Sequence, residues 1–310
     1  MNERDDPVLP STDILPRDEI EEGHVTHEGN VRENNEDASL FHEPEDGVTL
    51  GRKGRLVVVA DGMGGHLAGE VASQVAVDCV REQYLRREDV DPLESLSHAV
   101  TEANSVIYNR STENFSERGM GTTCTALVLR QGQAFTAHVG DSRAYLIRNG
   151  AVTLLTRDHA TPHGLLRALG AEDKVEVDMV GPVAVEPGDS FLVCSDGLTR
   201  HIEESEIGEI VKTTRSPQQA CERLLHRALE RGGLDNVTIR ILRVLQAGGQ
   251  PRVPPGTGAT GNPIDLDDTQ SLELPGEPAE GDPPPPPRLG FLILVLLLLA
   301  LATAVVAGLL

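Results

Sequence analysis

The chain is organised around one segment, Leu56-Val57-Val58-Val59-Ala60-Asp61-Gly62-Met63-Gly64-Gly65-His66. Its first five residues are apolar and predict a short buried strand, and a helical spacing of apolar residues begins near Leu67. The sequence therefore places Asp61 where a strand ends and a glycine turn begins. In that position the carboxylate is exposed, and the neighbouring backbone carbonyl can approach a cation.

Length, charge and cysteine content restrict the possible classes of protein. The 310 residues permit one large domain or two small ones. A formal net charge of -22 argues against nucleic-acid binding, which depends on basic surfaces. The cysteines are far apart in apolar segments, so we expect reduced core thiols, as in a reducing cytoplasm, rather than zinc ligands or disulfides. They are Cys79, Cys124, Cys194 and Cys221.

Two segments outside the apolar middle of the chain cannot form a core. Residues 1–22 are acidic and lack the apolar stretch of a secretory signal, so we expect a disordered N-terminus. Residues 247–288 are rich in Pro and Gly and carry several acids, which predicts a disordered linker that reaches roughly 35 Å as a flexible coil. The folded domain is therefore expected to span residues 23–246.

Residues 289–310 predict a transmembrane helix. They are uncharged and consist mainly of Leu, Ala and Val. At the rise of an α-helix this segment spans roughly 33 Å, enough to cross the hydrocarbon core of a bilayer. Because nothing follows Leu310 and Arg288 lies on the N-terminal side, we expect a single-pass tail anchor with the folded domain in the cytoplasm.

Helical and strand-like patterns are mixed along residues 23–246. Strands are expected between residues 24 and 41, at 56–60, in four pieces between residues 122 and 155, at 190–194 and at 236–244. Amphipathic helices are expected at 67–85, 92–109, 205–212 and 217–231. Because the strands cluster without a regular βαβ alternation, we predict an α+β fold built as a layered sandwich.

An acid beside glycine recurs at the predicted strand ends. A single Asp-Gly pair is ordinarily a turn, but several carboxylates gathered in one place repel each other unless a divalent cation joins them. Oxygen ligands without a Cys or His motif favour Mg²⁺ or Mn²⁺ over zinc. The acids are Asp61, Asp141, Asp196 and Asp235, together with the pair Glu36-Asp37.

Six ordered motifs resemble those of the PP2C (PPM) family of metal-dependent protein serine/threonine phosphatases, in its bacterial branch. They are Arg32 with Asn35-Glu36-Asp37, Ala60-Asp61-Gly62-Met63-Gly64-Gly65-His66, Gly119-Met120-Gly121-Thr122-Thr123, Gly140-Asp141-Ser142-Arg143, Cys194-Ser195-Asp196-Gly197 and Asp235-Asn236-Val237-Thr238. The resemblance covers residues 23–244. It implies a four-layer αββα sandwich of two antiparallel sheets, a metal-binding cleft at one end, and hydrolysis of phosphoserine and phosphothreonine in proteins.

The resemblance also implies a role for each acid. Asp61 would bridge two Mn²⁺ or Mg²⁺ ions, Gly62 would offer its backbone carbonyl to one of them, and Asp196 with Asp235 would complete the other. Asp141 would join Asp196 at a weaker third metal.

The remaining implied roles are catalytic. Glu36 and Asp37 would hold metal-bound waters, and Arg32 would grip the substrate phosphate, since its planar fork matches two phosphate oxygens. The alternative for Arg32 is a surface salt bridge to Glu33 or Glu36.

The chemistry implied is attack by a water activated between two metals, without a covalent phosphoenzyme. The chain departs from the family where eukaryotic members place a histidine after the Asp-Gly pair, since Met63 stands there. A metal-bound water is the expected substitute as general acid. His66 is expected to cap or pack against the following helix.

The flap of bacterial relatives looks shortened here, at residues 156–170. We therefore expect an open cleft and weak retention of the third metal. His159 and His163 lie in this segment and are expected to be exposed loop histidines, with proton donation as the alternative.

Two alternatives for the function stay open at this level. One is a catalytically weak phosphoprotein-binding or regulatory module of the same fold, and another is hydrolysis of a small phosphate ester. The resemblance and the predicted anchor together imply phosphorylated proteins as partners, including Ser/Thr kinases and their substrates at the membrane, and no nucleic acid.

Overall fold

The computed structural model describes residues 19–64, 68–87, 91–161 and 164–246. The predicted linker, the predicted transmembrane helix, His66 and His163 lie outside these residues. No helix within the described ranges is long and apolar enough to cross a membrane. The expected boundaries of the linker and the anchor therefore stay predictions.

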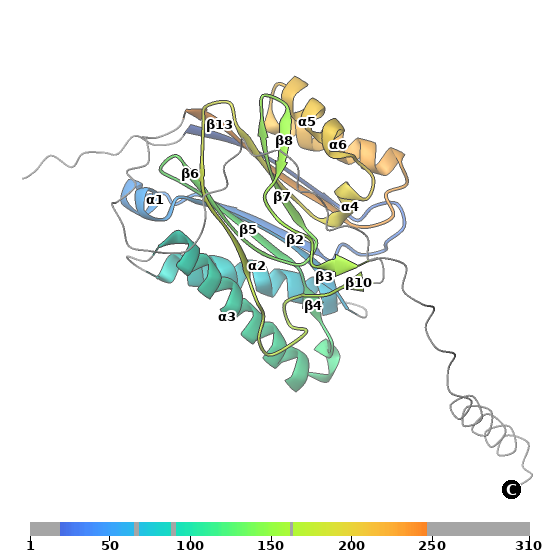
Figure 1. The fold of residues 1–310 in the computed structure, drawn as a ribbon. Coiled ribbons are helices and arrows are strands. Elements are labelled where there is room, and N and C mark those ends of the chain that lie inside the picture. The colour runs from blue at the N-terminus through green and yellow to red at the C-terminus, as the bar shows by residue number, and fades with distance from the viewer. Residues whose placement is uncertain (1–18, 65–67, 88–90, 162–163, 247–310) are drawn as a thin grey trace, which may run out of the picture. The chain divides into compact units, whose positions relative to one another are not determined.

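Two antiparallel sheets form the centre of the fold (Figure 1). The five-stranded sheet has the order β1 (Glu19–His27), β13 (Val237–Gln246), β12 (Ser190–Cys194), β7 (Arg143–Arg148) and β8 (Ala151–Leu154). The six-stranded sheet has the order β11 (Asp178–Ala184), β6 (Gln133–Val139), β5 (Cys124–Arg130), β3 (Arg55–Met63) and β2 (Asp37–His42), with β4 (Gly121–Thr122) paired to the end of β3. A small hairpin joins β9 (Ala160–Thr161) to β10 (Gly164–Leu165).

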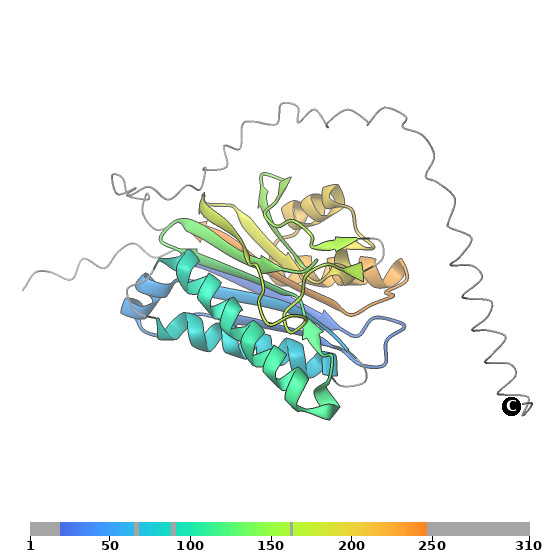
Figure 2. The ribbon, with the colours of Figure 1, turned by 60° about the horizontal axis from the view of Figure 1, so that its bottom comes forward.

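Helices cover the outer face of each sheet (Figure 2). The long helices α2 (Ala68–Arg86) and α3 (Pro92–Glu113) pack on the six-stranded sheet, and α1 (Gly47–Lys53) lies near the end of β5. The helices α4 (Asp196–Thr199), α5 (Glu204–Thr213) and α6 (Pro217–Glu230) pack on the five-stranded sheet. A single turn of 3₁₀ helix, η1 (Phe115–Glu117), follows α3.

The apolar run in β3 explains why it lies at the centre. Val57 and Val59 point into the core between the two sheets, whereas Leu56, Val58 and Ala60 point into the core under α2 and α3. Both faces of the strand are therefore buried, and a continuous apolar run replaces the alternation of a half-exposed strand. The predicted α+β fold with two antiparallel sheets and covering helices is confirmed.

The thiols agree with the prediction of reduced core cysteines. All four cysteines are free, and Cys124, Cys194 and Cys221 are buried. Burial raises the pKa of the Cys124 thiol to about 12, so this side chain stays protonated and behaves as a small apolar group.

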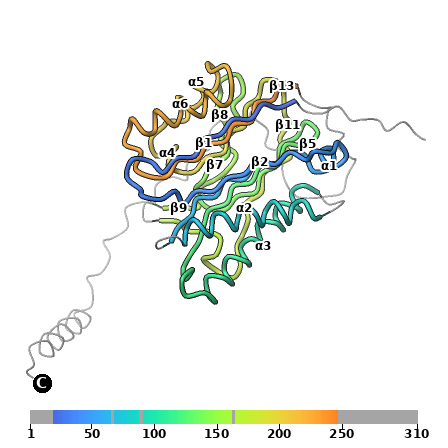
Figure 3. Tube along the Cα trace, turned by 180° about the vertical axis from the view of Figure 1, so that it is seen from behind, coloured from blue at the N-terminus to red at the C-terminus, as the bar shows by residue number. Residues whose placement is uncertain are grey.

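Two element boundaries correct the sequence predictions. β3 runs on through Asp61 to Met63, so Asp61 lies within a strand and opposite Asp37 of β2, not at a strand end. β1 begins at Glu19, so residues 19–22, expected in the disordered N-terminus, belong to the sheet. They pair with the end of β13, and Figure 3 shows the two strands side by side.

Candidate active site

An acid-lined cavity of about 530 Å³ opens where β3, α4 and the start of β13 come together. Seven of the eight predicted site residues line it: Arg32, Glu36, Asp61, Gly62, Asp141, Asp196 and Asp235. The eighth, Asp37, is the register partner of Asp61 on the neighbouring strand. The structure therefore brings together residues separated by up to about two hundred positions in sequence.

Asp61 is held by its backbone. Its N–H donates to Thr123 Oγ1 at 2.9 Å, and its carbonyl accepts from the Thr123 N–H at 2.9 Å. Thr123 Oγ1 lies 2.7 Å from Ser142 Oγ, next to Asp141. This hydrogen-bond network fixes the position of β3 relative to the turn that carries Asp141, and leaves the Asp61 carboxylate free to face the cavity.

Asp37 lies opposite Asp61, where β2, β12 and β13 are linked by Ser195. Ser195 Oγ donates to Asp37 Oδ2 at 2.8 Å and accepts from the Thr238 N–H at 3.0 Å. The other carboxylate oxygen, Asp37 Oδ1, is buried without a hydrogen-bond partner. Ser195 thus links the end of β12 to β2 and β13.

Asn236 is a positioning residue whose role the sequence did not reveal. Its Oδ1 accepts from the Glu36 N–H at 2.8 Å, and its Nδ2 donates to the carbonyls of Glu28 and Asn34 at 3.0 and 2.9 Å. Because Asn236 follows Asp235 directly, one side chain ties the loop of Glu36 to the strand that carries Asp235. The dipeptide Asp235-Asn236 was the available signal, but its partners are far away in sequence.

Burial removes water from the carboxylates and so disfavours their charged forms. Burial raises the pKa of Asp37 to about 6 and the pKa of Asp196 to about 7. Burial, followed by the charges of Asp37 and Asp196, raises the pKa of Asp61 well above its usual range. Burial also raises the pKa of Glu36 and of Asp141.

Two arginines neutralise part of this charge. Arg32 grips Asp235 with two contacts, Nε to Oδ1 at 2.9 Å and Nη2 to Oδ2 at 3.0 Å, and the hydrogen bond raises the pKa of Arg32. The carboxylate partner of Arg32 is thus Asp235, and not Glu33 or Glu36 as in the alternative of a surface salt bridge. Arg200 pairs with Asp196, and its Nη1 lies 3.0 Å from Asp235 Oδ2. Arg200 was not predicted as part of the site.

The cavity fits divalent cations by its donor set. Asp196 Oδ1, like Asp37 Oδ1, is buried without a hydrogen-bond partner, and such orphaned oxygens are rare unless an ion or water binds them. Mg²⁺ and Mn²⁺ prefer carboxylate and carbonyl oxygens. Among the described residues no three acidic, histidine or cysteine side chains already meet in a metal-binding arrangement. Repulsion between the acids and their ion pairs with Arg32 and Arg200 account for that spacing.

Gly62 is required by packing. A Cβ at this position would overlap the carbonyl oxygen of Gly69 in α2 and lie 2.5 Å from the carbonyl oxygen of Glu36. The Gly62 N–H donates to that same Glu36 carbonyl at 3.1 Å. Glycine thus lets α2 and the Glu36 loop approach β3, a reason additional to the predicted approach of its carbonyl to a cation.

His159 corrects the expectation of an exposed loop histidine. It is 7% exposed, accepts the Gly140 N–H on Nδ1 at 3.1 Å, and has Nε2 3.1 Å from Asp178 Oδ2. Its ring lies 4.8 Å from that of His138. His159 therefore holds the loop before β9 against the turn that carries Asp141.

Comparison with known proteins gives the class of protein. Residues 30–233 match the family model described as protein phosphatase 2C. The serine/threonine phosphatase stp of Listeria innocua is 35% identical over 243 residues, which cover 70% of this chain and 93% of that protein. The protein phosphatase PhpP of Streptococcus pneumoniae is 33% identical, over 70% of this chain and 95% of that protein.

Solved structures agree. The Mycobacterium tuberculosis serine/threonine phosphatase PstP/Ppp superposes with a TM-score of 0.63 at 32% identity, over 73% of this chain and 98% of that one. The catalytic domain of PstP in complex with two manganese ions gives a TM-score of 0.62 at 33% identity, over 73% and 99% of the two chains. These relatives define a class of bacterial protein serine/threonine phosphatases.

The chain belongs to the protein phosphatase 2C family. It is a metal-dependent protein serine/threonine phosphatase of the bacterial type, and the prediction of an enzyme of this class is confirmed.

Proposed function

We propose that the chain hydrolyses phosphoserine and phosphothreonine in proteins at the acid-lined cavity, with two Mn²⁺ or Mg²⁺ ions. The observation that carries this proposal is the group of buried carboxylates with unpartnered oxygens, Asp37 Oδ1 and Asp196 Oδ1, beside the Arg32 guanidinium. The two manganese ions bound to the PstP catalytic domain support the same choice of metal.

In this proposal Asp61, with the carbonyl oxygen of Gly62, would serve both ions, and Asp196 and Asp235 would complete the second. Asp141 would join Asp196 at a weaker third site. When bound, the ions lower the pKa of a water nucleophile and neutralise charge on the phosphoryl group.

The chain's own residues bind and orient the substrate. Arg32 is 52% exposed and lies at the rim of the cavity, where its fork can contact two phosphate oxygens. Glu36 and Asp37 accept hydrogen bonds from water and orient it. Met63 lines the cavity and carries no proton to give, so the leaving alkoxide takes its proton from water.

The test of this site is Asp61→Asn, assayed with a phosphothreonine peptide and Mn²⁺. We expect at least a roughly 100-fold loss of kcat/KM, because a bridging carboxylate is removed from the charge-stabilising site. Manganese binding by calorimetry should weaken in parallel. Asp78→Asn, an exposed acid on α2, is the control. Equal rates for Asp61→Asn and the wild type would refute the assignment.

We further propose that residues 289–310 attach the enzyme to a membrane, where phosphorylated membrane proteins, including Ser/Thr kinases and their substrates, would be accessible. The support is the uncharged Leu-, Ala- and Val-rich sequence. The variant Leu296→Arg/Leu299→Arg should move the protein out of carbonate-washed membranes, since each central arginine costs about 2.5–3.5 kcal/mol. Thr269→Arg/Ser271→Arg, with the same added charge in residues 247–288, should stay bound. Equal extraction of both would contradict the anchor.

A further inference from the structure

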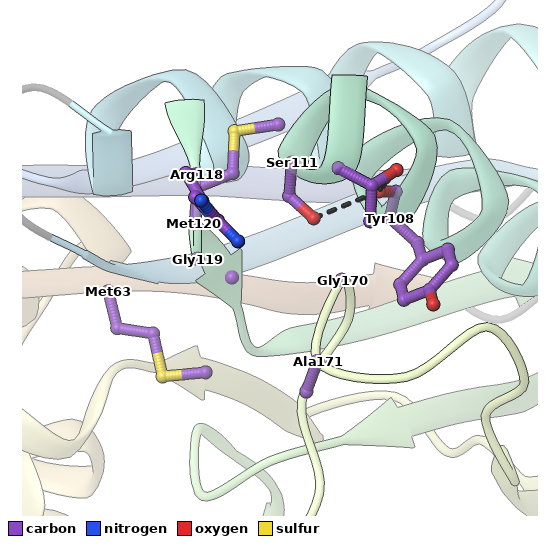
Figure 4. A pocket seen from close by; sticks show the side chains of 10 residues that line it. Met63, Tyr108, Ser111, Arg118, Gly119, Met120, Gly170 and Ala171 are labelled. Atoms are coloured by element: carbon purple, nitrogen blue, oxygen red, sulfur yellow. Dashed lines mark hydrogen bonds between the residues drawn. The ribbon is translucent and has the colours of Figure 1, made fainter. Parts of the chain in front are cut away.

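A second cavity of about 490 Å³ lies beside the acid-lined cavity. Figure 4 shows Met63, Tyr108, Ser111, Arg118 and Gly170 around it. The walls come from the end of α3, the connection from η1 to β4, and the loop at residues 170–171. Met63 lines both cavities and pairs with Gly121 of β4, so a chain leaving the acid-lined cavity over Met63 reaches this second cavity directly.

The charge of the second cavity is opposite to that of the chain. Among the described residues that line it, Arg118 alone is charged, in a chain with a formal net charge of -22. The neighbouring acid, Glu117, is occupied by Arg110, with contacts of 2.9 and 2.6 Å. Within the described part of the chain, no ion pair or hydrogen bond of the Arg118 side chain is found. Its guanidinium is therefore available to an external anion.

Exposed apolar surface adjoins this cation. Phe115 of η1 is 89% exposed, the most exposed large apolar side chain among the described residues. Phe115 lies three residues before Arg118 and does not line the cavity itself, whereas the half-buried Tyr108 does. Arginine and aromatic side chains are enriched where proteins recognise other chains. A surface of this composition suits a polypeptide better than a small metabolite.

We propose that the second cavity is a substrate subsite that takes an anionic side chain of the same polypeptide whose phosphorylated residue occupies the acid-lined cavity. Arg118 is its specificity-determining residue. An extended peptide advances roughly 3.3–3.6 Å per residue, so the anion lies a few residues from the phosphorylated one. A carboxylate or a second phosphate supplies the same chemistry. This inference rests on the proposed phosphatase function.

The experiment compares phosphothreonine peptides in which one glutamate is moved from four residues before to four residues after the phosphothreonine. At the best position, glutamate is then replaced by alanine, lysine or a second phosphothreonine. Both kcat/KM and the Kd from fluorescence anisotropy are measured with the full-length enzyme. At one position we expect kcat/KM for the glutamate peptide to exceed that for the alanine peptide about five- to tenfold, and kcat/KM for the lysine peptide to be lower. The peptide with a second phosphothreonine shows whether the subsite prefers a phosphate or a carboxylate.

Arg118→Glu should abolish or reverse the ratio between the glutamate and alanine peptides, and Arg118→Gln should reduce it. Arg86→Glu is the matched control, because it makes the same charge change at the far end of α2 and should keep the ratio. No preferred position, or a ratio unaffected in both Arg118 variants, would overturn the subsite. An equal change of this ratio in Arg86→Glu would show that the preference is a general effect of charge, and would also overturn the subsite. Selective binding without turnover of any peptide would support the subsite and contradict the proposed function.

Discussion

Arg200 is bound to two of the predicted metal ligands. It pairs with Asp196 and with Asp235, and its side chain is 54% exposed. A cation that binds these carboxylates must displace the guanidinium or share the acids with it. Arg200 therefore acts as an internal counter-charge that keeps the acids together without metal and competes with metal for them.

Replacing Arg200 by asparagine should strengthen manganese binding about fivefold, since two half-exposed ion pairs contribute roughly 0.5 kcal/mol each. Calorimetric titration with Mn²⁺ measures the affinity directly. Arg227→Asn is the matched control, because that arginine has the same 54% exposure but pairs with Glu206 and Glu230 away from the cavity. Weaker manganese binding by the Arg200 variant would show that the guanidinium supports the metal site instead.

The raised pKa values of the acids predict how the metal-free protein responds to pH. Asp196, with a pKa of about 7, and Asp37, at about 6, bind protons more tightly in the folded chain than in the unfolded one. The folded state therefore gains stability as pH falls from 8 to 6.5, by on the order of 1 kcal/mol. Below that window the gain is opposed, because burial lowers the pKa of His138 to about 4 and folding then excludes its proton.

Urea unfolding of the EDTA-treated protein at pH 8 and pH 6.5 measures this difference. Saturating Mn²⁺ should cancel it, because the ions take over the role of the protons. The variant Asp196→Asn should also show a smaller difference. Unchanged stability between pH 8 and pH 6.5 in the metal-free wild type would mean that burial does not raise the pKa values of these acids.

At the scale of elements, the site depends on the close approach of α2 to β3. Gly62 in the strand faces the Gly69 carbonyl in the helix, and a Cβ on Gly69 would lie 2.8 Å from the Glu36 carboxyl carbon. The first turn of α2 can therefore lie against both β3 and the Glu36 loop only because these positions are glycine.

Gly62→Ala should destabilise the fold by about 1–3 kcal/mol, the usual cost of overpacking, and lower activity by displacing Glu36 and Asp61. Thermal unfolding and peptide turnover measure the two effects. Gly51→Ala in α1 is the control, because nothing lies within 4 Å of its added Cβ. A Gly62→Ala protein as stable and active as the control would show that close packing does not require glycine at position 62.

The sequence predicted the elements with strong periodicity and missed those defined by their neighbours. The β3 run and the apolar spacing of α2 and α3 were sufficient by themselves. β11 was missed because Gly181-Pro182 interrupts it, and Pro usually argues against a strand. The structure accommodates it at the edge of the six-stranded sheet, with a register irregularity between Val180 and Val183.

The same limit applies to the site. The acids were predicted because each lies in a short local motif. Arg200 was not assigned to the site, and His159 was wrongly expected to be an exposed loop histidine. Their roles come from contacts distant in sequence, such as Arg200 with Asp235 and His159 with Gly140. Spacing along the chain carries no information on which distant segments meet.

At the scale of the whole molecule, Arg240 joins the two sheets. It lies on β13, is 9% exposed, and its Nη1 donates to Glu22 Oε1 on β1 at 2.6 Å. Its Nε donates to Ser39 Oγ on β2, in the other sheet, at 3.0 Å. Burial lowers the pKa of Arg240, and Glu22 opposes that effect. Glu22 lies in the segment expected to be disordered, so the folded unit needs residues before the predicted boundary at 23.

Glu22→Gln should destabilise the protein by roughly 2–3 kcal/mol, somewhat below the cost of breaking a fully buried pair, because it leaves a buried guanidinium without its counter-charge. Circular dichroism in urea measures the change, since the chain has no tryptophan. Glu21→Gln, on the exposed face of the same strand, should have little effect. The double variant Glu22→Leu/Arg240→Met should recover much of the loss, because an apolar pair needs no compensation. If the double variant were as unstable as Glu22→Gln, the uncompensated charge would not be the cause, and the packing of β1 on β13 would be.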